Sequence, residues 1–285
     1  MNNNNCTTKI LDGNTLAKQI KSGIAEQIKR DNLQVGLAVI IVGGDPASRI
    51  YVNHKKKDCE ECSITSYEYA LDESTTQAEL LELIEKINND SKINGVIVQQ
   101  PLPKHIVVNE INEAVSPLKD VDAFRADTVG KIAVGNYGFL PCTPAGCMEL
   151  IKSSGTDICG KECVVVGRSN IVGKPMALML LNESATVTVC HSRTRDLGEV
   201  TRRADILVSA VGIANLIKAD MVKDGAVVID VGMNRDSNGK LCGDVDFEAV
   251  QTKASYITPV PGGVGPMTRA MLMQNTLTAY KMQTL

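Results

Sequence analysis

Short, continuous apolar runs recur along the second half of the chain, and they constrain its fold more than any other feature. A strand buried on both faces has this pattern, and such strands form parallel sheets covered by helices. Segments with helical periodicity separate the runs, so this half is predicted to be a Rossmann-type parallel α/β sheet. The predicted strands cover 163–167, 186–190, 205–212, 226–232 and 256–263.

The first half shows the same alternation. Strands are predicted at 35–44, 64–70 and 94–99, and helices at 16–30, 47–62, 76–88 and 105–115. The stretch 116–144 is rich in Gly, Pro, Asp and Asn and has no long periodic run, so we interpret it as a crossing segment. Pro144 then begins a helix that runs to 155. We expect two α/β domains flanking a cleft: 1–143, with a C-terminal helix at 268–285 packing back on it, and 144–267.

Composition and charge disfavour several classes of protein. The net charge of −3 and pI of about 5.7 disfavour a general nucleic-acid binder. No apolar run reaches the roughly 18–20 residues needed to span a bilayer, and the polar start, 1–9, lacks the apolar core of a secretory signal. Nine cysteines, an odd number in a long chain, indicate reduced thiols in a cytoplasmic protein. Cys59 and Cys62 have no second C-x-x-C or histidine pair beside them, so no metal site is predicted.

The segment VVVGRSNIVGKPMALML reads as a strand, a glycine turn and a helix. Gly167 ends the strand and Gly173 precedes the helix, as in turns that direct helix amides toward a phosphate. The spacing differs from G-x-G-x-x-G, so an ordinary βα turn is the alternative.

The residues around this turn favour NADP over NAD. The end of the next strand reads CHSRTR, which offers Ser192 and Arg193 where an NAD site has an acid, and Arg168 lies in the turn. Cationic and hydroxyl groups suit a 2′-phosphate. The alternative is a solvated basic loop.

Three consecutive lysines in SRIYVNHKKK are not equivalent on a helix. At about 100° per residue, Lys55 falls close to Tyr51, whereas Lys56 and Lys57 rotate toward solvent. A partly buried lysine beside a tyrosine can transfer protons. The alternative is a structural ion pair between Lys55 and Asp58. Short-chain dehydrogenases also use Tyr-x-x-x-Lys, but after the glycine fingerprint, and here the pair comes before it.

Six stretches together resemble the bifunctional methylenetetrahydrofolate dehydrogenase/cyclohydrolase family over nearly the whole chain. They are SRIYVNHK, GVIVQQPLP, KDVDAF, PCTPAGCMELI, VVVGRSNIVGKPM and PVPGGVGPMT. The resemblance implies that NADP⁺ oxidises 5,10-methylenetetrahydrofolate to the 5,10-methenyl form, which is then hydrolysed to 10-formyltetrahydrofolate. It also implies a cytoplasmic homodimer. A monofunctional dehydrogenase and a non-catalytic nucleotide-binding module are the alternatives.

The resemblance also implies residue roles. Lys55 is the catalytic lysine, Gln99 sits against it, Tyr51 positions the substrate ring and Asp122 holds the amino edge of the pterin. The implied NADP contacts are Gly167, Arg168, Ser169, Ser192 and Met233. Arg193, which follows Ser192, is counted with them. The implied cleft wall is Gly262, Gly263 and Pro266.

The sequence departs from the family pattern at three positions. Ala123 replaces a glycine, Gln100 replaces leucine or methionine, and Arg269 replaces a small aliphatic residue. Arg269 falls in the first turn of the final helix, where a cation opposes the helix dipole. We expect it to bind the glutamate carboxylates of the substrate or an acidic side chain such as Asp122; extension into water is the alternative.

Overall fold

The computed structural model describes residues 8–284, and the contacts divide the chain into two compact units. Residues 8–17 and 143–268 form the six-stranded unit, and residues 18–142 and 269–284 form the three-stranded unit. Residues 1–7 of the polar start lie outside the described residues. The expected first domain includes 8–17, whereas the contacts group this stretch with 143–268 because its strand pairs there.

The six-stranded unit is built on a parallel sheet, as predicted. Its strand order is β1-β11-β8-β7-β5-β6, and every neighbouring pair is parallel. The strands are β1 (Lys9–Ile10), β5 (Glu162–Val166), β6 (Thr186–Cys190), β7 (Ile206–Ser209), β8 (Val227–Asp230) and β11 (Tyr256–Ile257). The strand predicted at 186–190 is not buried on both faces. It is the last strand on one side of the sheet, and Val189 is 39% exposed there.

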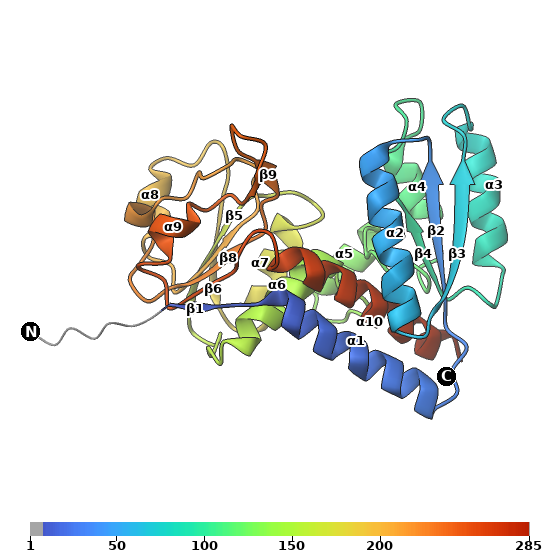
Figure 1. Ribbon diagram of the computed structural model, residues 1–285, viewed down its shortest axis with the longest axis horizontal. Helices are drawn as coiled ribbons and strands as arrows, with labels where there is room; N and C mark the ends of the chain where they lie inside the picture. Colours follow the sequence, from blue (N-terminus) through green and yellow to red (C-terminus); the bar gives the residue numbers. More distant parts are fainter. Residues whose placement is uncertain (1–7, 285) are drawn as a thin grey trace, which may run out of the picture. The chain divides into compact units, whose positions relative to one another are not determined.

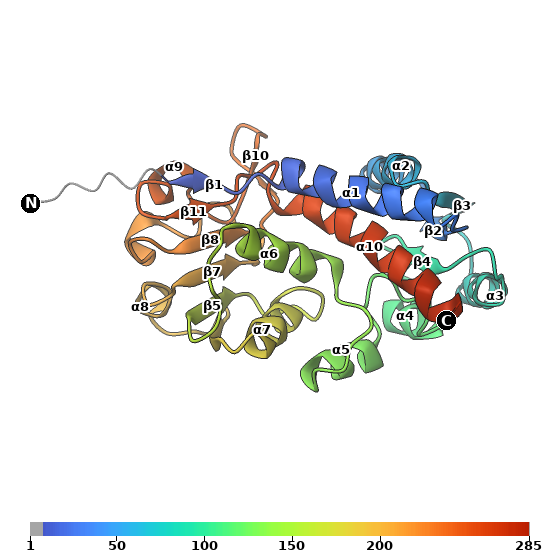
Figure 2. The ribbon, with the colours of Figure 1, turned by 90° about the horizontal axis from the view of Figure 1, so that it is seen from below.

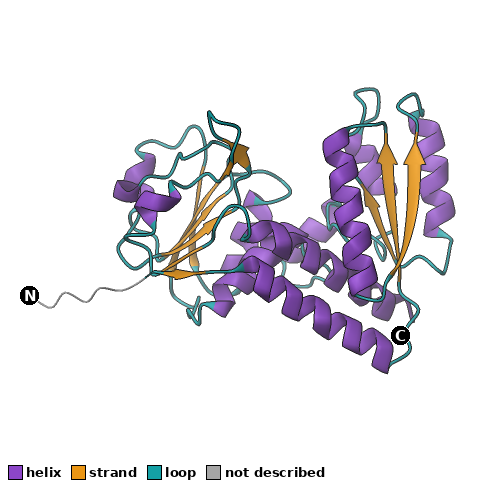
Figure 3. Ribbon diagram, in the orientation of Figure 1, coloured by secondary structure: helices purple, strands orange, loops and turns teal. Residues whose placement is uncertain are grey.

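Short elements complete this unit and connect its strands (Figure 3). The helices are α6 (Cys142–Ser153), α7 (Gly173–Asn182), α8 (Leu197–Thr201), α9 (Phe247–Val250) and the 3₁₀ turn η1 (Ala219–Met221). A small antiparallel ribbon joins β9 (Asn234–Arg235) and β10 (Leu241–Cys242). Strands β5 and β7 meet where the strand order reverses, and ligands of doubly wound sheets bind outside the carboxyl ends at such a point.

The three-stranded unit has the parallel order β3-β2-β4, with β2 (Gly36–Val42) buried along its whole length. Its flanking strands are β3 (Thr65–Leu71) and β4 (Gly95–Val98). On one face, Ile40 and Val98 pack with Leu80, Ile84 and Ile111 from the helices that follow β3 and β4. Helix α2 contacts β2 and β3 (Figure 1).

The helices of this unit mostly match the predicted ranges. They are α1 (Gly13–Arg30), α2 (Pro46–Glu61), α3 (Gln77–Asn88), α4 (Val108–Ala114), α5 (Ala126–Ala133) and α10 (Val264–Thr284). The first residues of α1 and α10 belong to the six-stranded unit, and both helices run side by side in Figures 1 and 2. Helix α5 lies inside the stretch interpreted as a crossing segment, so that interpretation was incomplete.

Candidate active site

Lys55 lies on the half-buried side of α2, and its amine contacts the end of β4. Lys55 Nζ donates a hydrogen bond of 3.0 Å to Gln99 Oε1. Lys56 and Lys57 are exposed, which confirms that the three lysines are not equivalent. Tyr51, one turn earlier, is 38% exposed on the same helix. Of the three consecutive lysines, Lys55 is therefore the one whose amine makes a hydrogen bond to Gln99.

Gln99 is itself held in one orientation. Its backbone amide donates to Ile40 O at 2.8 Å, which continues the pairing of β4 with β2, and its side-chain Nε2 donates to Gln100 O at 2.6 Å. Because the amide nitrogen is engaged in this way, the amide oxygen points to Lys55. The sequence departure at Gln100 is therefore compatible with this pair, since Gln100 contributes its backbone carbonyl.

Asp58 does not form the ion pair with Lys55 that was the structural alternative. Its side chain is 3% exposed, and its two oxygens accept from Lys21 Nζ at 2.6 Å and Arg269 Nη1 at 3.0 Å. An acidic side chain was one of the partners expected for Arg269. The structure shows such a partner, but it is Asp58 and not Asp122. Helix α10 begins at Val264, so Arg269 lies in its second turn and not in the predicted first turn, and the expected cost from the helix dipole is correspondingly small.

The two residues before the Val121–Asp122 dipeptide anchor it by their side chains. Lys119 Nζ donates to Ile87 O at 2.9 Å and Asp90 O at 2.8 Å, so it caps the end of α3. Asp120 accepts from the Phe124 and Arg125 amides, both at 3.2 Å, and thereby fixes the turn into α5. Sequence reasoning missed these supporting roles.

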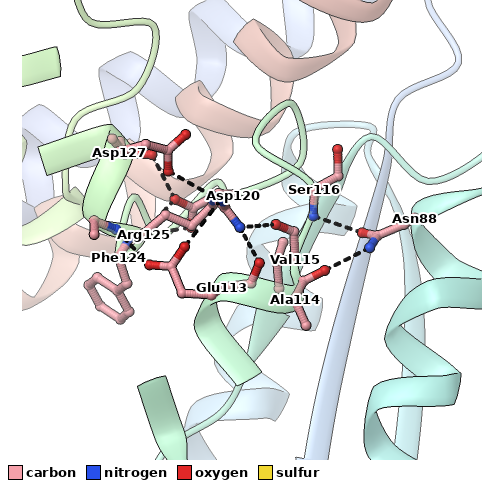
Figure 4. Close-up of polar contacts among 11 residues, drawn as sticks. Asn88, Glu113, Ala114, Val115, Ser116, Asp120, Phe124, Arg125 and Asp127 are labelled. Carbon is pink, nitrogen blue, oxygen red and sulfur yellow. Dashed lines mark hydrogen bonds and ion pairs between the residues drawn. The ribbon is translucent and has the colours of Figure 1, made fainter. Parts of the chain in front are cut away.

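Arg125 ties the same segment to α4 (Figure 4). Its guanidinium donates to Val115 O at 2.9 Å and to Glu113 O, and it pairs with the Asp127 carboxylate at 2.8 Å. On the other side of the segment, Asn275 of α10 donates to Val121 O at 2.8 Å. The position of Asp122 is therefore fixed from several elements of the three-stranded unit.

The environment of Asp122 raises the pKa of its carboxyl to about 6. Burial is the main cause, the Lys55 ammonium opposes it, and the Asp120 charge adds to it. The next residue, Ala123, is fully buried and has φ of +58°, a left-handed conformation that favours glycine. This explains why glycine is usual there, and it means that this chain carries backbone strain of about 1 kcal/mol beside Asp122.

At the carboxyl ends of β5 and β6 the structure brings together the residues predicted to bind the adenosine end of NADP. Val166 pairs with Cys190, so Arg168 and Ser192 each lie two residues beyond a paired position. Both side chains are exposed, as is Arg193. Gly167 has φ of +127°, and a Cβ there would lie 2.3 Å from Ala210 O. Backbone of this kind leaves room for a close approach by a phosphate.

The loop into α7 is shaped by Ser169. Its hydroxyl oxygen accepts from the amides of Val172 at 3.1 Å and Gly173 at 3.3 Å. A Cβ at Gly173 would lie 2.2 Å from Gly167 O, so this position also needs glycine. The arginine and hydroxyl groups, together with the tight glycine turn, fit a phosphorylated dinucleotide.

Two buried carboxylates that sequence reasoning missed organise the loops after β7 and β8. Asp244 is fully buried and accepts from the amides of Val211 at 2.7 Å and Ile213 at 3.0 Å and from Asn234 Nδ2 at 2.9 Å. Asp230 accepts from the Asp244 amide at 2.9 Å, and burial raises its pKa to about 6. Met233, which is 60% exposed, lies in the loop that these residues hold.

The residues of the predicted cleft wall belong to the six-stranded unit. Gly262 has φ of +106°, and a Cβ on Gly263 would lie 2.6 Å from Pro259 O. Pro266 follows in the first turn of α10. Lys55, Gln99, Asp122 and Arg269 belong to the three-stranded unit, so each group is described within its own unit.

Residues 8–284 were also searched for metal sites, reactive thiols and membrane-spanning helices. In this range there is no group of three or more His, Cys, Asp or Glu side chains that could hold a metal ion. Burial raises the pKa of the Cys59 and Cys62 thiols to about 12, so both are protonated packing residues. None of the helices in the described part of the chain is long and apolar enough to cross a membrane.

Comparison with known families and proteins gives concordant results. Residues 11–122 match the catalytic domain of tetrahydrofolate dehydrogenase/cyclohydrolase, and residues 141–284 match its NAD(P)-binding domain. The bifunctional protein FolD of Acetivibrio thermocellus is 62% identical over 278 residues, which is 96% of this chain and 98% of that protein. FolD of Ruminiclostridium cellulolyticum is 56% identical over 97% of this chain and 99% of its own length.

Solved structures agree with these relatives. The bifunctional dehydrogenase/cyclohydrolase FolD of Campylobacter jejuni superimposes with a TM-score of 0.94 at 51% identity, covering 97% of this chain and 99% of that one. The Trypanosoma brucei enzyme, solved with NADP and an inhibitor, has a TM-score of 0.92 at 38% identity and covers 97% and 98%. Both domains and nearly the full length are matched, so the resemblance seen in the motifs is confirmed: the chain belongs to the tetrahydrofolate dehydrogenase/cyclohydrolase family.

Proposed function

We propose that this enzyme oxidises 5,10-methylenetetrahydrofolate to the 5,10-methenyl form with NADP⁺ and hydrolyses that product to 10-formyltetrahydrofolate. The observation that carries the proposal is the Lys55–Gln99 contact of 3.0 Å beside a segment that fixes Asp122. A module that only bound nucleotide would have no need of an oriented amine beside a carboxylate. The FolD relatives of high identity support the same pair of activities.

The hydrolytic step depends on the three-stranded unit. Water adds to the methenyl carbon and one carbon–nitrogen bond of the bridge then breaks, so a proton must leave the water and another must reach the nitrogen. Lys55 Nζ is the group placed to move these protons, and Gln99 Oε1 holds it in position. Tyr51 supports the ring of the substrate on the exposed side of α2.

The oxidation depends on bringing the substrate and the cofactor face to face. NADP⁺, when bound, accepts the hydride from the methylene carbon. The residues that would hold its phosphates and ribose are Gly167, Arg168, Ser169, Ser192 and Arg193, and the loop of Met233 would meet its nicotinamide end. The substrate contacts proposed for the six-stranded unit are Gly262, Gly263 and Pro266.

Asp122 gives the folate site a defined pH dependence. An ionised carboxylate accepts the paired N–H donors of the pterin, and a protonated one does not. Because its pKa is raised to about 6, we expect the KM for the folate to rise as the pH falls below about 6, by up to tenfold per unit. Asp122→Asn should raise this KM about 10–100-fold at neutral pH and flatten its pH dependence. Initial rates at pH 5–8 test this; a pH-dependent KM retained in the variant would contradict it.

Arg168 is expected to select NADP⁺. The wild-type enzyme should prefer NADP⁺ to NAD⁺ by about 1–3 kcal/mol in kcat/KM, the worth of a charge-assisted hydrogen bond. Arg168→Ala should narrow that preference mainly through the cofactor KM, because the 2′-phosphate is remote from the hydride. Arg203→Ala is the control, since Arg203 pairs with Glu162 at the start of β5, the opposite end of that strand. Equal kcat/KM values for both cofactors in the wild type would refute this selection.

The decisive experiment follows both products of the purified enzyme separately. With 5,10-methylenetetrahydrofolate and NADP⁺, the proposal requires methenyl and then formyl product. A monofunctional dehydrogenase would stop at the methenyl form, and a non-catalytic module would yield neither product.

We also propose that the enzyme is cytoplasmic and forms a homodimer. Free, mostly buried cysteines in the described residues support a reducing compartment. The homodimer follows from the family resemblance, and light scattering of the purified protein tests it.

A further inference from the structure

Asp58 is a buried carboxylate on the same helix as the catalytic lysine. Residues three apart on a helix are neighbours, so Asp58 lies within reach of Lys55 along α2. A buried carboxylate needs partners, and a lysine at that spacing would be one. Lys55 nevertheless bonds to Gln99, and the oxygens of Asp58 accept from Lys21 and Arg269.

Within the ion pairs around Asp58, positive and negative charges balance only when Arg269 is present. Lys21 and Arg269 supply two positive charges, and Asp58 and Glu61 supply two negative charges. Lys21 is shared between the two carboxylates, so it cannot neutralise both. Without Arg269 the cluster would carry one net negative charge, on the helix of Lys55 and one turn beyond it.

The other groups that face Lys55 do not provide this neutralisation. Burial raises the pKa of the Asp122, Cys142 and Cys59 side chains, and the Lys55 ammonium opposes each rise. On α2 itself Tyr51 is also close, and Gln99 is neutral. None of these groups supplies a positive charge to Asp58. If Asp58 lost Arg269, its carboxylate would compete with Gln99 for the Lys55 amine.

We propose that Arg269 is a positioning residue that neutralises Asp58 and so leaves Lys55 in place against Gln99. This inference rests on the proposed function of Lys55. It assigns a role to one of the three positions at which the sequence departs from the family pattern, and the partner is an internal carboxylate. A small aliphatic residue at 269 would leave Asp58 to Lys21 alone.

The test is the kcat of methenyl hydrolysis in Arg269→Leu, with the KM for the folate as the second readout. An Asp58 carboxylate without Arg269 draws the Lys55 amine away from Gln99, so kcat should fall about 3–10-fold, the worth of one hydrogen bond, while the KM changes little. Arg269→Lys should keep the wild-type kcat, because it retains the charge. Adding Asp58→Asn to Arg269→Leu should restore kcat to its wild-type value.

Arg30→Leu is the matched control, because it removes an arginine of the same unit that pairs with Asp31 at the surface. It should leave kcat unchanged. A wild-type kcat in Arg269→Leu, with a lower unfolding temperature alone, would overturn the inference. So would a kcat that falls and stays low in the double variant. Wild-type protein without hydrolytic activity would instead refute the proposed function.

Discussion

Replacing Lys55 with methionine is expected to lower the rate of methenyl hydrolysis by about 10²–10⁴-fold, the usual contribution of a positioned proton-transfer group. Most of the dehydrogenase activity should be lost as well. Methionine has nearly the length of lysine but no amine, so Gln99 Oε1 loses its donor while α2 keeps its packing. Separate assays of formyl and methenyl product measure the two losses.

Lys56→Met and Lys57→Met are the matched controls for this substitution. Both side chains are exposed on the same helix, and both variants remove one positive charge. They should retain nearly full activity in both assays. Equal losses in all three variants would show that the net charge of the segment matters and that Lys55 has no special role.

The second large effect is expected from Asp244→Ala. This substitution leaves the amides of Val211 and Ile213 and the side chain of Asn234 without their buried acceptor. Each such donor costs about 1–3 kcal/mol, so the free energy of unfolding of the six-stranded unit should fall by about 3 kcal/mol or more. Urea denaturation measures the loss, and the KM for NADP⁺ should rise because the loops after β7 and β8 loosen.

Asp246→Ala provides the comparison for this loss. Asp246 is two residues away and pairs with Lys218, with its side chain 33% exposed. Exposed pairs contribute about 0–1 kcal/mol, so this variant should stay near wild type. A loss below about 1 kcal/mol in Asp244→Ala would mean that water replaces the carboxylate readily.

The parallel sheets and the different orientation of Lys55 were predictable because they depend on local periodicity. A buried strand such as β2 is apolar along its length, and the 100° step of a helix separates Lys55 from Lys56 whatever surrounds them. The need for glycine at position 167 was also predictable, because a tight turn from a strand into a helix requires it. These signals lie within a few residues of the sequence.

The missed features depend on contacts between distant residues. Strand β1 has two residues, too few for a pattern, and it is defined by its pairing with β11. The partner of Arg269 lies 211 residues away at Asp58, a distance that no motif spans. Asp230 and Asp244 looked like ordinary polar residues because their role is to accept from backbone amides of neighbouring loops.

The three-stranded unit is assembled from two stretches that are far apart in the sequence, 18–142 and 269–284. Asn275, which holds the carbonyl beside Asp122, is in the second stretch. A ribosome makes the chain from its N-terminus, so the whole of 143–268 must be synthesised before Asn275 and Arg269 exist. The six-stranded unit can therefore fold while the first stretch still lacks its last helix. The proposed hydrolytic site is therefore completed only after the residues of α10 have been made, although its lysine precedes them in the chain.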